Sequence, residues 1–176
     1  MKLRSEARDK RGAFTLIELL AVLALLGLLA GLVATGVAQA VERARSDRAE
    51  AELAVLAAAL EEYRRAFGDY PRTDSGAGLL AALLGKKDPG MAPIEARPLL
   101  DISRFTVVGG EGDSRLLDPW GLPYAYAYRV PDSGWVNPLY VLCSRGPDGA
   151  MAPGLVAGGF PERRAGENAD NRYAEP

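Results

Sequence analysis

Residues 14–38 read FTLIELLAVLALLGLLAGLVATGVA, and this stretch is apolar or glycine apart from Thr15, Glu18 and Thr35. A helix of about 20 apolar residues is long enough to cross the hydrocarbon core of a bilayer. Glu18 is the exception in this pattern, because an ionisable residue inside a spanning segment is costly and points to a function. The stretch therefore predicts a membrane-spanning helix and makes Glu18 a candidate functional residue.

The preceding residues 1–13, MKLRSEARDKRGA, carry five basic side chains against two acidic ones. A basic flank before an apolar run holds the N-terminus in the cytoplasm and sends the following chain outward. The residues themselves leave two interpretations open. The helix is either an uncleaved anchor or a secretory signal cut after the A-x-A pattern at 38–40, although the apolar run is longer than that of ordinary signals.

Beyond the apolar run the pattern continues as an amphipathic helix. Apolar residues recur at three- and four-residue steps, which places them in one stripe: Ala49, Leu53, Leu56, Leu60, Tyr63 and Phe67. No proline interrupts the chain before Pro71. The pattern predicts a single helix over 14–67, which would be ~80 Å long at 1.5 Å per residue.

The composition limits the classes of function. The residues after Gly68, about 110 of them, suffice for one small domain. The net charge of −2 does not favour nucleic acid as a partner. The chain has no histidine, which excludes Ser-His-Asp and Cys-His sites and makes an enzyme an unfavoured interpretation. Cys143 is the single cysteine and lies in an apolar run, so we expect a small core residue, with a reactive or intermolecular thiol as the alternative.

The region after Gly68 predicts a small α+β head. We expect a turn at Asp69-Tyr70-Pro71 and then a short helix over 76–84, capped by Thr73, Asp74 or Ser75. The rest is expected as a loop over 85–104 with a short turn near 99–100, a glycine-rich turn over 109–114, a hairpin over 131–138, and strands over 105–108, 124–130 and 139–144. The predicted fold is thus a long N-terminal helix packed on a small antiparallel sheet.

Two features of the head carry particular expectations. In Asp118-Pro119-Trp120-Gly121 the proline and glycine predict a rigid turn, and Trp120 is expected to fill the core. The strand after it alternates tyrosine and alanine, which places three tyrosines on one face. That face either packs across the sheet and onto the long helix, or forms a surface on which a carbohydrate stacks.

Several segments together carry a resemblance to a known family. Residues 11–18, RGAFTLIE, resemble the processing site of type IV pilins and of the pseudopilins of type II secretion. Residues 67–73, FGDYPRT, residues 117–124, LDPWGLPY, and residues 144–149, SRGPDG, are similar to segments of the major, G-type pseudopilins. The fold that this resemblance implies is pilin-like.

The resemblance implies how the N-terminus is processed. A prepilin peptidase would cut between Ala13 and Phe14, with a cut after Gly12 as the alternative, and the new amine of Phe14 would be methylated. Glu18 then becomes the fifth mature residue, and its carboxylate would meet the amine of a neighbouring subunit during filament assembly. The alternative is that Glu18 only reaches toward the membrane interface.

The resemblance also implies a calcium site. The family loop that matches 144–149, with a following acidic segment, binds Ca²⁺ through carboxylates and main-chain carbonyls, the hard ligands that this ion prefers. The matching groups here are the Arg145 carbonyl, Asp148, Asn168 and Asp170. The alternative is a solvated acidic tail.

The organisation expected from these observations has four parts: a cleaved leader over 1–13, a transmembrane and filament-core helix over 14–38, a stem helix over 39–67, and a head over 68–176. The resemblance implies a single-pass inner-membrane protein with a periplasmic head, which assembles into the pseudopilus that drives protein export. Its partners would be membrane lipid, further copies of itself, other pseudopilins, the prepilin peptidase and the inner-membrane assembly platform. The alternatives are a minor type IV pilin and a membrane-tethered binding module.

Overall fold

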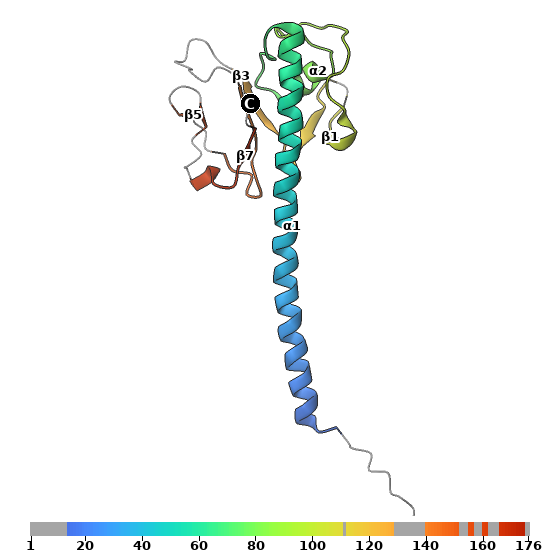
Figure 1. Ribbon diagram of the computed structural model, residues 1–176, viewed down its shortest axis with the longest axis vertical. Helices are drawn as coiled ribbons and strands as arrows, with labels where there is room; N and C mark the ends of the chain where they lie inside the picture. Colours follow the sequence, from blue (N-terminus) through green and yellow to red (C-terminus); the bar gives the residue numbers. More distant parts are fainter. Residues whose placement is uncertain are drawn as a thin grey trace, which may run out of the picture. The chain divides into compact units, whose positions relative to one another are not determined.

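The computed structural model describes residues 14–110, 112–128, 140–151, 155–156, 160–161 and 166–174 (Figure 1). Over these residues the elements follow in the order α1 (Leu16–Phe67), α2 (Gly76–Leu83), η1 (Ile102–Arg104), β1 (Thr106–Val108), β2 (Arg115–Leu117), β3 (Ala125–Tyr128), β4 (Tyr140–Ser144), β5 (Leu155–Val156), β6 (Phe160–Pro161), η2 (Gly166–Asn168) and β7 (Arg172–Tyr173). The α+β arrangement of a long N-terminal helix and small antiparallel sheets is confirmed.

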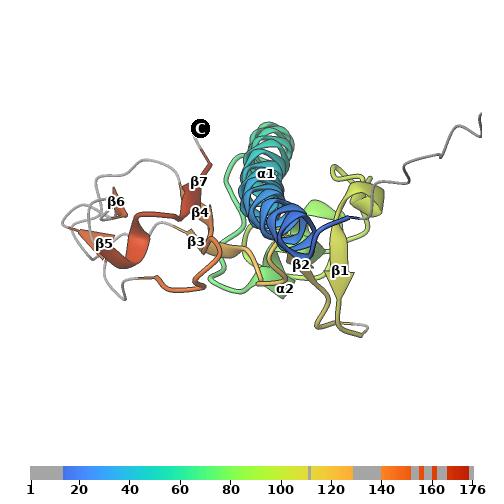
Figure 2. The ribbon, with the colours of Figure 1, turned by 90° about the horizontal axis from the view of Figure 1, so that it is seen from below.

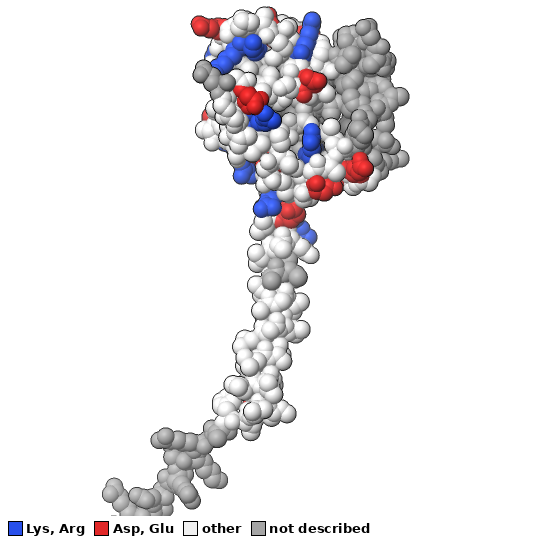
Figure 3. Space-filling view, turned by 180° about the vertical axis from the view of Figure 1, so that it is seen from behind, with Lys and Arg blue, Asp and Glu red and all other residues white. Residues whose placement is uncertain are grey.

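Helix α1 is continuous, as the absence of proline predicts, and the chain divides within it into two compact units, between Glu42 and Arg43. In the first unit the large apolar side chains from Phe14 to Val41 are 47–79% exposed. It contains the one stretch, within the part of the chain that the structure describes, that is apolar and long enough to cross a membrane. Seen from behind, its surface is uncharged over nearly all its length (Figure 3).

The second unit is the head, built on the amphipathic part of α1. The predicted stripe is its core: Ala49, Leu53, Leu56, Leu60 and Tyr63 are at most 1% exposed. In Figure 2 the sheet β3–β4–β7 and the pair β1–β2 lie on either side of α1, and α2 packs beneath it. The stripe therefore packs in one core with side chains of α2 and of the strands.

The end of α1 and the start of α2 follow local chemistry. Gly68 adopts a φ of +84°, and its amide bonds the Arg64 carbonyl at 2.8 Å, which closes the helix. Ser75 is the N-cap of α2, and its hydroxyl accepts the Gly78 amide at 3.4 Å. The following loop holds one turn of 3-10 helix at η1, capped by Asp101, rather than the turn expected near 99–100.

Within the described residues the strands of the head form three antiparallel sheets. β1 pairs with β2, β3 with β4, and β4 with β7, while β5 pairs with β6. The strands predicted at 105–108, 124–130 and 139–144 are confirmed as β1, β3 and β4, with bounds that differ by one or two residues where these are described. The expected hairpin over 131–138 lies outside the described residues. β2, β5, β6 and β7 were not predicted, because none of these two- or three-residue strands lies in an alternating or apolar run as long as those that predicted β1, β3 and β4.

One core prediction is wrong. Trp120 is partly exposed and lies outside the buried cluster, whereas Asp118, two residues earlier, is only 3% exposed. The Asp118 carboxylate accepts hydrogen bonds from the amides of Trp120, at 3.0 Å, and Leu122, at 2.9 Å. The turn is therefore stabilised by a buried carboxylate and by Gly121, whose φ is +87°, and not by burial of the indole.

Candidate functional sites

The N-terminus of α1 carries the first candidate site. Glu18 Oε2 accepts the Thr15 amide at 2.9 Å and the Thr15 hydroxyl at 2.7 Å, and the Glu18 amide bonds the Thr15 hydroxyl at 3.3 Å. This reciprocal arrangement is a capping box, in which Thr15 is the N-cap and Glu18 the third helical residue. The Glu18 carboxylate is thus held at the N-terminal end of α1, bonded to Thr15, the residue that follows Phe14.

The expected cleavage site lies between Ala13 and Phe14. Phe14 is described and is 79% exposed, whereas Ala13 lies outside the described residues. Glu18 therefore sits four residues from the position where a cut would create a new amine. The capping box was missed in the sequence, although T-x-x-E before an apolar run is its signature.

The tyrosine face of β3 is the second candidate. Tyr124 and Tyr126 are 3% and 4% exposed, and the Tyr126 hydroxyl donates to the Pro71 carbonyl at 2.9 Å. The Tyr128 hydroxyl donates to Asp69 Oδ2 at 2.7 Å. Tyr124 and Tyr126 are buried in the core, Tyr128 is half-buried against it, and all three hydroxyl groups are bonded. Packing is therefore confirmed and the carbohydrate surface is wrong.

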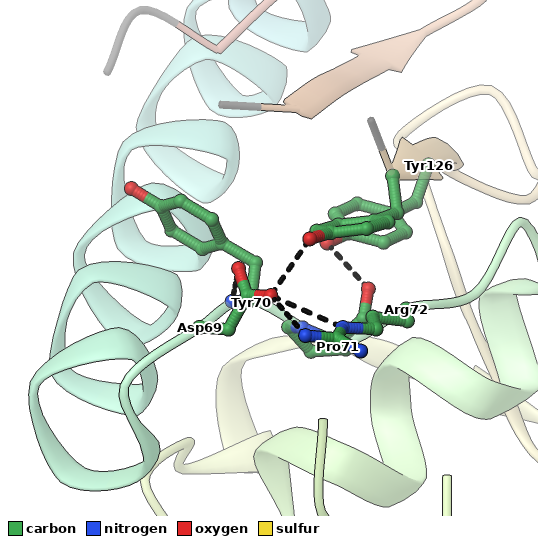
Figure 4. A network of polar contacts seen from close by, with 6 residues as sticks. Asp69, Tyr70, Pro71, Arg72 and Tyr126 are labelled. Carbon is green, nitrogen blue, oxygen red and sulfur yellow. Dashed lines mark hydrogen bonds and ion pairs between the residues drawn. The ribbon is translucent and has the colours of Figure 1, made fainter. Parts of the chain in front are cut away.

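Asp69 is the centre of the network in Figure 4. Its carboxylate also accepts the Tyr70 amide at 2.9 Å and the Arg72 Nη2 at 3.0 Å. Partial burial raises the pKa of Asp69, but these hydrogen bonds outweigh it and hold the pKa below the ordinary value of 3.8. The network fixes the turn after α1 against β3.

The loop 145–150 and the segment 168–171 form the third candidate, and the structure brings them together. Asp170 Oδ2 lies 3.4 Å from the Asp148 amide, and a Cβ built on Gly146 would stand 2.7 Å from the Asp170 carbonyl oxygen. The Asp148 carboxylate itself accepts the Ala150 amide at 2.8 Å and is exposed. Both carboxylates expected from the sequence are therefore at this junction.

The amide of Asn171 shows how oxygen atoms gather there. One end of this amide lies 2.8 Å from the Arg145 carbonyl oxygen and 3.2 Å from that of Ala150, and the other end lies 2.9 Å from Asn168 Oδ1. The hydrogen bonds are satisfied with the Asn171 NH₂ toward the carbonyls, where it donates to both. A cation here would require the amide to turn its oxygen toward them. Asn171 thus faces the loop, while Asn168, the residue expected there, supports it from behind.

The candidate cation site has few side chains that could bind a metal. Among the described residues no group of three or more His, Cys, Asp or Glu side chains could hold a metal ion. A cation here would rely on two carboxylates together with carbonyl and amide oxygens, which fits Ca²⁺ and does not fit zinc. The loop is buttressed from below, because the Ser144 hydroxyl donates to Asp118 Oδ2 at 2.6 Å and accepts the Gly146 amide at 3.3 Å.

The pilin-like class of proteins is defined by a long N-terminal helix, whose first half is apolar and exposed, and by a small antiparallel head that follows it. The family described as "Type II secretion system (T2SS), protein G" matches residues 36–155, and the "Prokaryotic N-terminal methylation motif" matches residues 8–34. The chain belongs to the type II secretion system protein G family, the major pseudopilins.

Similar proteins share most of their length with the chain. Type II secretion system core protein G of Escherichia coli (strain K12) is 32% identical over 82% of this chain and 88% of its own. The protein of the same name from Pseudomonas aeruginosa is 31% identical, over 81% and 89%. That from Vibrio cholerae is 30% identical, over 86% and 92%.

Proposed function

We propose that the chain is a structural subunit of the pseudopilus that drives protein export by type II secretion. The apolar part of α1 carries the proposal, because its large side chains are 47–79% exposed and must be covered by lipid or by further copies of the chain. The precursor would span the inner membrane once, with its N-terminus in the cytoplasm and its head in the periplasm. The protein then has no catalytic role.

Assembly requires that the same helix serve in two surroundings. Before assembly its apolar side chains face lipid, and afterwards they face the helices of other copies and of other pseudopilins, a nearly neutral exchange because both surroundings are apolar. The prepilin peptidase would act between Ala13 and Phe14 before this step, and the inner-membrane assembly platform would carry it out.

Glu18 is the polar residue of α1 that we propose pairs with a neighbouring subunit when the helix moves from lipid into the filament. Cleavage creates a charged amine on Phe14, and the carboxylate of a neighbouring subunit would pair with it. An unpaired buried charge costs about 3–5 kcal/mol, so only the register that pairs them is stable. The capping box supports this role, because it holds the carboxylate at the end of the helix where the amine arises.

The test is the mature N-terminus of protein purified from its own cell. We expect the mass of a chain that begins at Phe14 and carries one added methyl group, and cross-linking should yield a ladder of multimers. A matched strain that lacks the prepilin peptidase should retain the leader and yield no ladder. A chain that begins at Met1 or at Val41 in the normal strain would contradict the proposal.

We further propose that the junction of 145–150 and 168–171 binds Ca²⁺. Asp148 and Asp170 would supply the carboxylates, and Arg145 a carbonyl oxygen, with the amide oxygen of Asn171 next to it and Asn168 behind. The bound ion would supply positive charge that holds two acidic segments together. The approach of the two segments supports this proposal, because Asp170 Oδ2 lies 3.4 Å from the Asp148 amide and both carboxylates are at the junction.

The full chain in detergent micelles should melt at a higher temperature in calcium chloride than in EGTA with magnesium chloride. Asp148→Ala should remove that difference. Glu167→Ala is the matched control, since Glu167 is an exposed acid of the same segment, and it should keep the difference. An equal melting temperature of the unaltered protein in both buffers would exclude the site.

A further inference from the structure

The C-terminal strap, residues 166–174, lies against the stem helix with a groove between them. The groove has a volume of about 570 Å³, and its lining includes Leu53 and Ala54 of α1 and Arg172 to Ala174 of the strap. Along this groove the strap and the helix are not in close apolar contact. Polar contacts must therefore contribute to the attachment.

Arg172 makes such contacts. Its Nη2 donates to the Ser46 hydroxyl at 3.1 Å, and its Nε lies 3.2 Å from Glu50 Oε1. Ser46 and Glu50 are one helical turn apart in the first turns of the stem that belong to the head. The planar guanidinium suits this geometry, because its Nη2 donates to Ser46 while its charge lies beside the Glu50 carboxylate, although Nε makes no hydrogen bond of its own.

The same guanidinium also holds the main chain of the candidate cation site. Its Nη1 donates to the Asp170 carbonyl at 3.0 Å, and the side chain of Asp170 faces the loop at the Asp148 amide, 3.4 Å away. A cation between the two segments would attract both carboxylates and hold strap and loop together more firmly than the 3.4 Å contact alone. A shift of Asp170 would move the acceptor of Nη1 and displace the guanidinium from Ser46 and Glu50.

We propose that Arg172 is a latch that couples cation binding at the 145–150 and 168–171 junction to closure of the C-terminal strap on the stem helix at Ser46 and Glu50. The proposal rests on the calcium site proposed above and adds to it a conformational consequence. With the cation bound, the strap is closed over the stem. With the cation removed, the strap and loop open and expose the strand beneath them.

Cys143 is a built-in reporter of this opening. It is the single cysteine of the chain, it is 0% exposed, and its backbone pairs with Tyr173 of the strap. Its sulfur lies 3.8 Å from that of Met151, which follows the loop. Because the thiol is buried, reaction with a thiol reagent requires opening of the strap.

The experiment measures the rate at which DTNB reacts with Cys143 in the full chain in detergent micelles, in calcium chloride and in EGTA with magnesium chloride. At ~100 times its Kd, calcium should slow the reaction of the unaltered protein by about 100-fold, because only the closed form binds it. Arg172→Met should leave calcium binding measurable by calorimetry, but the reaction should slow only a few-fold.

Further variants keep the test decisive. Ser46→Ala with Glu50→Ala removes both acceptors on the stem and should reproduce the effect without a change in the strap, including the case in which Arg172→Met fails to fold. Arg172→Lys keeps the positive charge but lacks the planar guanidinium. Calcium should slow its Cys143 reaction by a factor between those of the unaltered protein and of Arg172→Met. Arg97→Met, a change of an exposed arginine elsewhere in the head, should behave as the unaltered protein.

The outcomes separate the two proposals. If the unaltered protein binds no calcium in the calorimeter, the calcium site is excluded and the latch with it. If it binds calcium but the reaction of Cys143 is not slowed, closure is not coupled to the ion. If the latch variants bind calcium and keep the full 100-fold effect, Arg172 is not the connecting residue.

Discussion

Tyr124 and Glu52 are 72 residues apart in the chain, and the tyrosine hydroxyl donates to the glutamate Oε2 at 2.6 Å. Glu52 lies on the stem helix and is 6% exposed, and its other oxygen accepts Arg48 Nε at 2.7 Å. Desolvation, followed by the hydrogen bond to Glu52, raises the pKa of Tyr124, so the phenol remains a donor. A buried carboxylate of the stem thus depends on the head for one of its partners.

Tyr124→Phe should destabilise the head, because it leaves an oxygen of the buried carboxylate without its donor. The expected loss is about 1–3 kcal/mol of unfolding free energy, measured by denaturation of the full chain in micelles. Tyr128→Phe is the comparison, since its partner Asp69 keeps its bonds to Tyr70 and Arg72, and a smaller loss is expected. A loss at Tyr124 no larger than that at Tyr128 would contradict this assignment.

The stem could be predicted from the sequence, because its apolar stripe and its lack of proline depend only on local spacing. The same holds for Gly68, which closes α1 through its own backbone. For the cap of α2 the sequence left Thr73, Asp74 and Ser75 as alternatives, and the structure identifies Ser75. Glu52 could not be assigned a buried role, since a glutamate on a charged helix face is ordinarily solvated. Its burial follows from a tertiary contact with Tyr124, which no helical periodicity reveals.

The candidate sites divide in the same way. Asp148 and Asp170 were found through resemblance, and the structure brings their segments together. Asn171 and Arg172 were missed, because an amide that faces carbonyls and an arginine that reaches another helix are defined by the folded strap. The prediction for Trp120 was wrong because a buried Asp118 satisfies the turn and leaves the indole partly exposed.

The network around Asp69 should make stability depend on acid pH. The pKa of this carboxyl in the folded chain lies below its ordinary value of 3.8, so its contribution is complete at neutral pH. It is lost as the pH falls from about 4 through the folded-state pKa. Asp69→Asn should therefore lower the melting temperature at pH 7 and weaken its dependence on pH below 4.

Asp113→Asn is the matched control for the acid profile. Asp113 is an exposed aspartate whose ion pair with Arg115 is also at the surface, so its contribution should be small. If the two variants give the same pH profile, the network of Asp69 does not stabilise the fold in the way its contacts indicate.

Gly146→Ala should disturb the strap more than an alanine at another left-handed glycine. Gly146 and Gly112 have φ values of +66° and +90°, so both substitutions carry a backbone cost of about 1–2 kcal/mol. A Cβ at Gly146 would also meet the Asp170 carbonyl oxygen at 2.7 Å, whereas one at Gly112 meets nothing within 4 Å. We expect Gly146→Ala to cost about 1–3 kcal/mol more and to raise the reaction rate of Cys143. Equal effects at both positions would show that strap and loop are not in contact.

Substitution of Glu18 can separate its local role from its role between subunits. The carboxylate closes a capping box with Thr15, and the proposed assembly needs its charge to meet the amine of a neighbour. Glu18→Gln keeps an acceptor for the Thr15 amide but lacks the charge, whereas Thr15→Ala removes the hydroxyl of the box and keeps the charge. In cells that also express the unaltered protein, Glu18→Gln should be processed normally, with its incorporation into cross-linked multimers reduced by at least about tenfold. Thr15→Ala should be incorporated to a greater extent, since the loss of one cap costs only about 1 kcal/mol. Incorporation of Glu18→Gln at the level of the unaltered chain, with loss in Thr15→Ala, would assign Glu18 to capping alone.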